Sequence, residues 1–302
     1  MDYVMELEGL SKKYGGKKVV DGFSLKMEKG HIYGLIGPNG AGKTTVMKMM
    51  AGLTGADEGS MRVFGSEDLD KMRDRISFII EEPYMDLHVT ARQNMEYVRL
   101  LRGIPDRKRI DELLTFVGLA DTGKKIAKEF SLGMRQRLGL AMAMLPGPEI
   151  MVLDEPINGL DPEGIIDVRN MLKELVNERG VTLLISSHIL KELSELCTDY
   201  AIIRNGKLIE ELSHEELLQR TNTRLALQTD DVARTATILE DQLNIHDYKI
   251  THENEIHVYE KLDDLKRISK AVTEGGLIIT RFNLEGESLE EYYIGKVGEN
   301  HE

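Results

Sequence analysis

The sequence has 302 residues, of which 41% are hydrophobic and 30% are charged, and its net charge is −13. These values are typical of one large or two modest globular domains. The negative charge disfavours broad attraction to nucleic acid, so no nucleic-acid partner is predicted. A single cysteine, Cys197, allows no disulfide within the chain and indicates a reducing compartment.

No segment approaches the roughly 18 to 20 uninterrupted apolar residues of a membrane-spanning helix. The first ten residues, MDYVMELEGL, lack the basic region and apolar core of a signal peptide. We therefore expect a cytoplasmic protein, or one that acts on the cytoplasmic side of a membrane.

The first predicted elements are strands followed by a strand–turn–helix unit. Residues 2–10 and 17–29 alternate loosely between apolar and polar positions, which predicts two strands of an antiparallel edge sheet. An apolar run over 31–37 ends in glycine, and residues 43–53 follow it with a helical pattern. This order predicts a strand, a glycine-rich turn and a helix.

The segment from about residue 88 to 145 contains little strand pattern. Its helical periodicity is clearest over 90–103 and 107–119. We predict that this segment is a helical subdomain inserted into the sheet protein.

Two further apolar runs, 149–156 and 181–188, end in polar residues, and an amphipathic helix is predicted between them over 163–180. The pair Asn205-Gly206 predicts a tight hairpin. Alternation of strands and helices favours a mostly parallel sheet with helices on its faces. The polar strand ends then mark the edge where a ligand binds.

The pattern changes again after residue 212, so we predict a domain boundary there, with a first domain over 1–212 and a second over 213–302. The order in the second part is strand, helix, two strands, helix, strand, which predicts a small ferredoxin-like α+β domain. Three of its histidines share no helical face, so they are interpreted as surface residues rather than metal ligands. The elements cover residues 223–229, 232–243, 246–259, 262–276 and 277–284, and the histidines are His246, His252 and His257.

Residues 37–44, GPNGAGKT, match the phosphate-binding pattern G-x-x-x-x-G-K-[ST]. Glycines allow successive backbone N–H groups to face a phosphate, the lysine offers positive charge, and the hydroxyl can ligate Mg²⁺. The alternative is a glycine-rich turn that only precedes a helix. We predict ATP and Mg²⁺ as ligands, with Lys43 also in a catalytic role. The assigned residues are Gly37, Asn39, Gly40, Gly42, Lys43, Thr44 and Thr45.

The apolar run IMVL at residues 150–153 leads directly into Asp154 and Glu155. We predict that Asp154 holds Mg²⁺ and that Glu155 is the general base for an attacking water. An ordinary acidic pair between a strand and a loop is the alternative.

With these motifs in this order, residues 1–212 resemble the ATPases of ATP-binding cassette (ABC) transporters. The resemblance implies a P-loop NTPase cassette of the α/β class, with an antiparallel edge sheet and a helical subdomain. The other shared features are Tyr14, EEP at 81–83, SLGMRQR at 131–137, NGLD at 158–161 and SSH at 186–188.

The family resemblance also implies roles for single residues. In that family two cassettes pair head to tail, so Ser131 and Gly133 would complete the γ-phosphate site of a second copy, and Asp161 would communicate across the interface. His188 would contact the γ-phosphate and orient the attacking water, and Tyr14 would stack on adenine. The alternatives are a capped strand end for His188 and a buried core position for Tyr14.

Two positions depart from the family pattern. The usual L-S-G-G-Q reads Phe130 to Met134, FSLGM, which keeps the serine and the second glycine, so function should persist. Glu81 stands where the family has glutamine. Because a carboxylate oxygen can ligate a hard cation, we predict that Glu81 joins Thr44 and Asp154 at Mg²⁺. The alternative is that Glu81 points to solvent.

Glu81, SLGMRQRLGLAMAM, NGLDP and the late segment SLEEYYI together resemble the bacitracin and lantibiotic branch of peptide-antibiotic exporters. This implies an ATP-hydrolysing subunit that dimerises on ATP and binds a separate integral membrane permease at the inner face of the cell membrane. Residues 81–98 are the expected permease contact, with a solvated loop as the alternative. The alternative function is a soluble ABC ATPase of translation or DNA repair, which the single cassette and the absence of sustained heptads disfavour.

Overall fold

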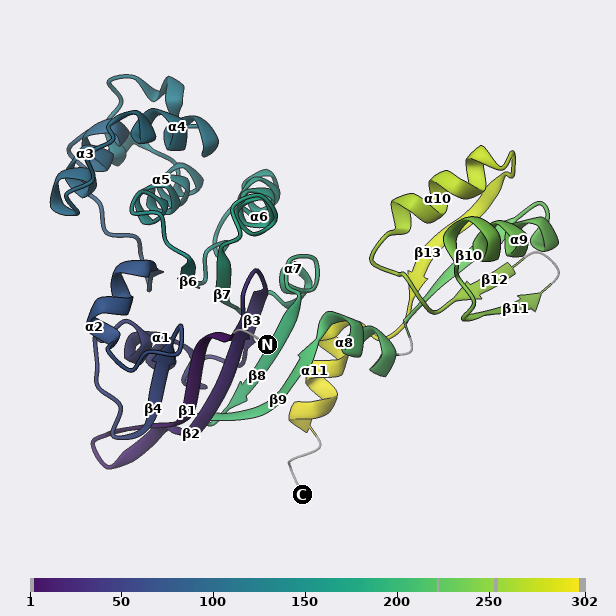
Figure 1. Ribbon diagram of the computed structural model, residues 1–302, viewed down its shortest axis with the longest axis horizontal. Coiled ribbons are helices and arrows are strands. Elements are labelled where there is room, and N and C mark those ends of the chain that lie inside the picture. Colours follow the sequence, from purple (N-terminus) through teal and green to yellow (C-terminus); the bar gives the residue numbers. More distant parts are fainter. Residues whose placement is uncertain (1–2, 222, 253–254, 299–302) are drawn as a thin grey trace. The chain divides into compact units, whose positions relative to one another are not determined.

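The computed structural model describes residues 3–221, 223–252 and 255–298 (Figure 1). The chain divides into two compact units, Met1–Leu212 and Ser213–Glu302. No helix among the described residues is long and apolar enough to span a bilayer.

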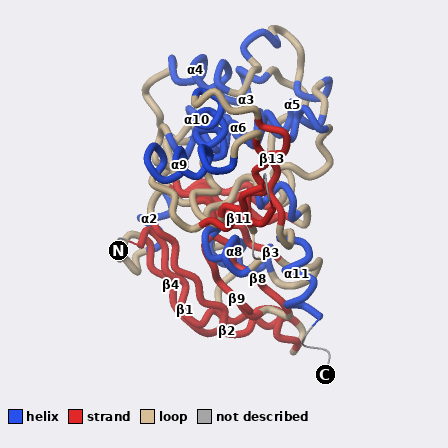
Figure 2. Tube along the Cα trace, turned by 90° about the vertical axis from the view of Figure 1, so that its right-hand side faces the viewer, coloured by secondary structure: helices blue, strands red, loops and turns tan. Residues whose placement is uncertain are grey.

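The first unit contains a three-stranded antiparallel sheet. Its strands are β1 (Tyr3–Tyr14), β2 (Lys17–Glu28) and β4 (Glu58–Val63), in the order β2-β1-β4. Figure 2 shows the three strands side by side. The predicted antiparallel edge is confirmed, although β1 is longer than expected and β4 was not predicted.

The second sheet of this unit has six strands in the order β5-β6-β7-β3-β8-β9, and the pairs from β5 to β8 are parallel. The strands β3, β6 and β7 are buried along their whole length, because helices and the other sheet cover both faces, as expected for a parallel sheet. The six strands are β3 (Ile32–Ile36), β5 (Ile76–Ile79), β6 (Ile150–Asp154), β7 (Thr182–Ser187), β8 (Asp199–Arg204) and β9 (Lys207–Ser213).

The predicted hairpin joins β8 to β9. Asn205 and Gly206 have φ angles of 50° and 77°, which is the left-handed conformation that a two-residue hairpin requires. The helix α1 (Lys43–Met50) follows β3 and ends three residues earlier than predicted. Its buried Val46 and Met47 belong to the core that the two sheets share.

Three longer helices form the predicted helical subdomain: α3 (Ala91–Leu101), α4 (Lys108–Phe116) and α5 (Leu132–Met144). Thr90 starts α3 with a capping box. Its side chain accepts from Gln93 N, and the Gln93 side chain accepts from the backbone N–H of Thr90. The remaining helices of the unit are α2 (Leu69–Met72), α6 (Pro162–Asn177) and α7 (Leu190–Ser194).

The second unit has a four-stranded antiparallel sheet in the order β11-β12-β10-β13. Together with α9 and α10 this is the βαββαβ arrangement of a ferredoxin-like fold, which confirms the prediction. Its core lies between the sheet and these two helices. The short helix α8 and the helix α11 were not predicted, and Arg220 of α8 donates to the Tyr292 hydroxyl of α11 at 3.2 Å. The elements are α8 (His214–Arg220), β10 (Arg224–Thr229), α9 (Val232–Leu243), β11 (Tyr248–His252), β12 (Glu255–Val258), α10 (Leu265–Glu274), β13 (Ile279–Glu285) and α11 (Leu289–Gly298).

Candidate active site

The carboxyl ends of β3, β6 and β7 meet at one edge of the six-stranded sheet. The register places Ile36 beside Ser187 and Asp154 beside Ser186. The glycine-rich loop therefore leaves the sheet next to the acidic pair and next to His188. This is the edge at which parallel α/β sheets bind their ligands.

The loop between β3 and α1 forms a cradle that only glycine permits at two positions. A Cβ on Gly37 would lie 2.4 Å from the carbonyl oxygen of Ile203, and Gly42 has a φ of 110°. The loop and the two acids enclose a cavity of about 210 Å³. Such a cradle of backbone N–H groups at the start of a helix fits a phosphate chain. Six of the seven predicted loop residues line this cavity, and Gly37 does not; the six are Asn39, Gly40, Gly42, Lys43, Thr44 and Thr45.

The Lys43 side chain is folded into the loop and is 6% exposed. Its Nζ donates to the carbonyl oxygen of Gly37 at 2.6 Å. Burial lowers the pKa of Lys43, and the negative charges of Glu155 and Asp154 oppose that shift. A phosphate bound in the loop would give this ammonium a charged partner in place of the backbone carbonyl oxygens that it now contacts.

The Asp154 carboxylate is buried and is held by two hydroxyls. Its Oδ2 accepts from Thr44 Oγ1 at 2.9 Å, and its Oδ1 accepts a short hydrogen bond from Ser186. The adjacent oxygens of Thr44 and Asp154 are hard donors of the kind that Mg²⁺ prefers. Magnesium takes only one or two protein ligands when phosphates supply the others, so this pair fits such a site.

Ser186 is a site residue that the sequence reasoning did not assign. Its hydroxyl also accepts from the Glu155 backbone N–H at 3.0 Å, so one side chain positions both acids. Its signal in the sequence was the polar end of the strand at residues 186–188.

Glu155 lies directly after β6 with a φ of 50°, a conformation that is uncommon outside glycine. Its Oε2 lies 2.8 Å from Nδ1 of His188. The structure thus joins the predicted base to the predicted water-orienting histidine, rather than leaving His188 as a capped strand end.

Glu81 follows the short strand β5 and has a φ of 65°. Its Oε1 lies 2.6 Å from Nζ of Lys48, and this ion pair raises the pKa of Lys48. Glu81 also lines a cavity of about 850 Å³ together with Asp154 and Glu155. Glu81 therefore borders the same cavity as the acidic pair, and its carboxylate is paired with Lys48.

Tyr14 lies at the end of β1 and is 49% exposed, so the alternative of a buried core position is wrong. Its hydroxyl donates to Thr54 Oγ1 at 3.3 Å, and Lys12 Nζ lies 5.6 Å from the ring centroid. An exposed ring steadied in this way can offer a face for stacking.

Ser131, Gly133 and Asp161 are not among the residues that line the phosphate-loop cavity. Ser131 caps α5, with Oγ accepting from Met134 N at 3.2 Å, and Asp161 caps α6, with Oδ1 accepting from Gly164 N at 3.2 Å. The start of α5 is exposed, and its first residue, Leu132, lines the larger cavity that Asp154 and Glu155 also line.

These features define a P-loop nucleotide-binding ATPase: a glycine cradle, a buried lysine, a hydroxyl–carboxylate pair and a second carboxylate held by histidine.

Comparison with known proteins leads to the same class. A family model described as ABC transporter matches residues 20–158. A bacitracin transport ATP-binding protein of Bacillus licheniformis is 38% identical over 301 residues, which is 99% of this chain and 98% of the relative.

A lantibiotic transport ATP-binding protein of Streptococcus pyogenes is 39% identical over 212 residues, covering 70% of this chain and 92% of the relative. Among solved structures, an ATP-binding subunit of an ABC transporter is similar with a TM-score of 0.65 and 26% identity, over 72% of this chain and 93% of that one. The chain therefore belongs to the ABC transporter ATPases, and the resemblance drawn from its motifs is confirmed.

Proposed function

We propose that this chain is the ATP-hydrolysing subunit of an exporter of peptide antibiotics, and that two copies close on ATP to drive a separate membrane permease. The observation that carries this proposal is the similarity to a bacitracin transport protein over 99% of the chain, which includes the second unit as well as the cassette. The transported cargo class comes from the names of the relatives.

In the proposed reaction each residue of the site has a separate role. Glu155 accepts a proton from the attacking water, and His188, bonded to it at 2.8 Å, orients that water. Lys43 stabilises the negative charge of the β- and γ-phosphates. Thr44 and Asp154 would hold Mg²⁺, which supplies charge neutralisation at the phosphates when it is bound.

The geometry at α5 supports a shared site between two copies. Ser131 is exposed, and it lies at the positive end of a 13-residue helix. Because Ser131 and Gly133 do not line the chain's own phosphate-loop cavity, the ligand proposed for this helix end is a phosphate held by a second copy. Gly133 lacks a side chain that would obstruct that approach.

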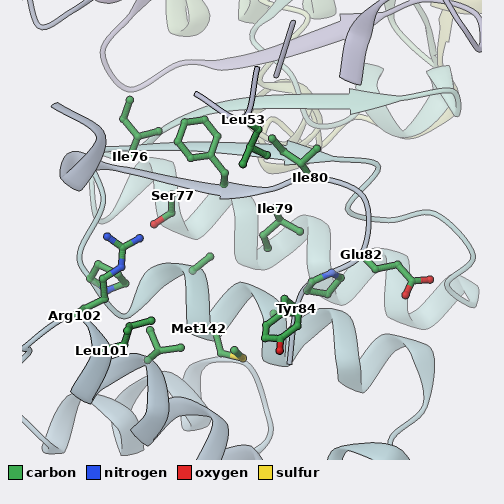
Figure 3. A pocket seen from close by; sticks show the side chains of 16 residues that line it. Leu53, Ile76, Ser77, Ile79, Ile80, Glu82, Tyr84, Leu101, Arg102 and Met142 are labelled. Atoms are coloured by element: carbon green, nitrogen blue, oxygen red, sulfur yellow. The ribbon is translucent and has the colours of Figure 1, made fainter. Parts of the chain in front are cut away.

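Part of the predicted permease segment 81–98 lines an apolar groove of about 400 Å³ (Figure 3). Leu101 of α3 and Met142 of α5 lie on one side, and Leu53 and Ile80 lie on the other. Tyr84 is 95% exposed at the groove. An apolar groove with exposed large side chains at its rim fits a short amphipathic segment of a membrane protein, which would hold this subunit at the inner face of the membrane.

The test is affinity purification of the full chain from membranes of cells that express it, followed by identification of the bound proteins. We expect an integral membrane protein to be recovered, and we expect Leu101→Glu to lose it because a charge enters the groove. Ile250→Glu, at an exposed residue of β11, is the control that should retain it. Recovery of ribosomal proteins without a membrane protein would instead support the translation alternative.

A further inference from the structure

Another cavity lies at the opposite edge of the six-stranded sheet from the phosphate loop. It is bounded by the residues that precede β6 and β7, by the end of α6 and by α4, and its volume is about 290 Å³. Three cationic side chains line it, namely Lys29, Arg109 and Arg179.

None of the side chains of Lys29, Arg109 and Arg179 is held in an ion pair in the part of the chain that the structure describes, although Lys29, after Arg75, contributes to lowering the pKa of Glu149. Glu149 is the one acid in the lining, and it is already paired with Arg75 at 2.6 Å. The cavity therefore carries a local positive excess in a chain whose net charge is −13.

Neutral groups orient the two guanidinium groups. Arg109 donates to the carbonyl oxygen of Met144 at 3.4 Å and lies flat against Gly147, where a Cβ would be only 2.8 Å from its Nη2. Arg179 lies over the ring of Phe116, with its Cζ 4.7 Å from the ring centroid. These contacts hold the arginines in place without neutralising them.

We propose that this cavity binds a phosphate group, carried by an inorganic or a small organic phosphate, at a site separate from the nucleotide site. Two guanidinium forks match the oxygens of a phosphate, and the lysine adds a third charge. The cavity is small for a drug-sized ligand and sufficient for a phosphate with a short organic part. Met144, Met151 and Val181 provide apolar lining for such a part. The ligand would join α4 to the end of α6, so its binding would stabilise the first unit independently of the nucleotide.

The test uses the full chain with Lys43→Ala, which weakens anion binding at the phosphate loop. Inorganic pyrophosphate is titrated into this protein without Mg²⁺ by isothermal titration calorimetry, with glycerol 3-phosphate as a second arm. We expect saturable binding of at least one of the two probes with a stoichiometry of one. The arm that binds more tightly identifies an inorganic or an organic phosphate as the ligand.

Adding Arg179→Gln is expected to raise the dissociation constant roughly 10-fold or more, because a charge-assisted hydrogen bond is lost. Arg109→Lys keeps the charge but loses the fork, so we expect it to weaken binding as well. The matched control is Lys173→Gln, the same charge change at an exposed residue of α6 outside the cavity. No saturable binding of either probe, or equal affinities in the Arg179→Gln and Lys173→Gln proteins, would overturn the proposal. Thermal melting of each variant shows whether it is folded.

Discussion

At the scale of single residues, Glu155 combines an uncommon backbone conformation with a direct bond to His188. We expect Glu155→Gln to bind ATP with near-normal affinity, because the amide has the same shape and still pairs with His188. Hydrolysis should fall by roughly 10² to 10⁴, the usual contribution of a general base. Phosphate release and equilibrium binding of a fluorescent ATP analogue measure the two effects.

The control for this variant is Glu163→Gln, an exposed acid in the first turn of α6. It should hydrolyse ATP at the normal rate. If Glu155→Gln also turned over normally, Glu155 would not be the base.

Glu81 is held by Lys48, yet both side chains are partly exposed, with 65% and 35% of their surfaces accessible. An exposed ion pair contributes at most about 1 kcal/mol, so the carboxylate is free to turn toward a cation. We expect Glu81→Gln to raise the Mg²⁺ concentration for half-maximal ATPase activity several-fold, since a neutral amide oxygen binds Mg²⁺ more weakly.

Lys48→Gln separates the two interactions of Glu81. It removes the ion pair but leaves the carboxylate, so the Mg²⁺ requirement should fall or stay constant. An unchanged rate and an unchanged Mg²⁺ requirement in Glu81→Gln would exclude Glu81 as a ligand.

At the scale of elements, one face of the four-stranded sheet is polar while the other is buried under α9 and α10. Glu255 of β12 bonds to His257 at 2.8 Å and to Arg281 of β13 at 3.0 Å. Arg281 also forms an ion pair with Glu285, which in turn pairs with Arg224 of β10 at 3.1 Å. The network thus crosses three neighbouring strands.

The pKa of Glu255 is lowered chiefly by its hydrogen bond with His257 and then by Arg281. A lowered carboxyl pKa stabilises the fold above the unfolded value of about 4.3, and that stability is lost as the pH falls through the lower folded value. We expect Glu255→Gln to lower the melting temperature at pH 7, with a difference from the wild type that narrows below about pH 4. Calorimetry at several pH values measures this.

Glu287→Gln, an exposed acid in the loop after β13, is the control and should melt like the wild type at every pH. A deficit in Glu255→Gln that is equal at pH 7 and at pH 3.5 would mean that packing, and not ionisation, is responsible.

At the scale of the whole molecule, the proposed dimer depends on the start of α5. We expect Glu155→Gln saturated with MgATP to sediment as a dimer, and we expect Ser131→Ala in that background to shift it toward monomer. Loss of the serine also removes the cap of α5, which costs about 1 kcal/mol of stability. Ser213→Ala removes the equivalent cap of α8, so it reports that cost without touching the proposed interface. A Glu155→Gln protein that remained monomeric with MgATP would contradict the shared site.

Much of the fold could be predicted because its signals are local. Apolar runs became β3, β6 and β7, and the turn residues Asn205-Gly206 became a hairpin. The strand β5 was missed because its four residues are stabilised by pairing with β6, more than 70 positions away. No short window of sequence contains that contact.

At the active site and in the proposed phosphate cavity too, local sequence signals have to be distinguished from contacts between distant residues. The residue types and their spacing predicted the phosphate loop and the acidic pair, because phosphate and Mg²⁺ binding requires glycine, lysine and carboxylate groups at such positions. Only the tertiary structure decided that Ser186 positions both acids, that Lys48 holds Glu81, and that Arg109 and Arg179 share a cavity. These contacts depend on strand register and on the contacts of α4 with the ends of α5 and α6, which join residues that are distant along the chain.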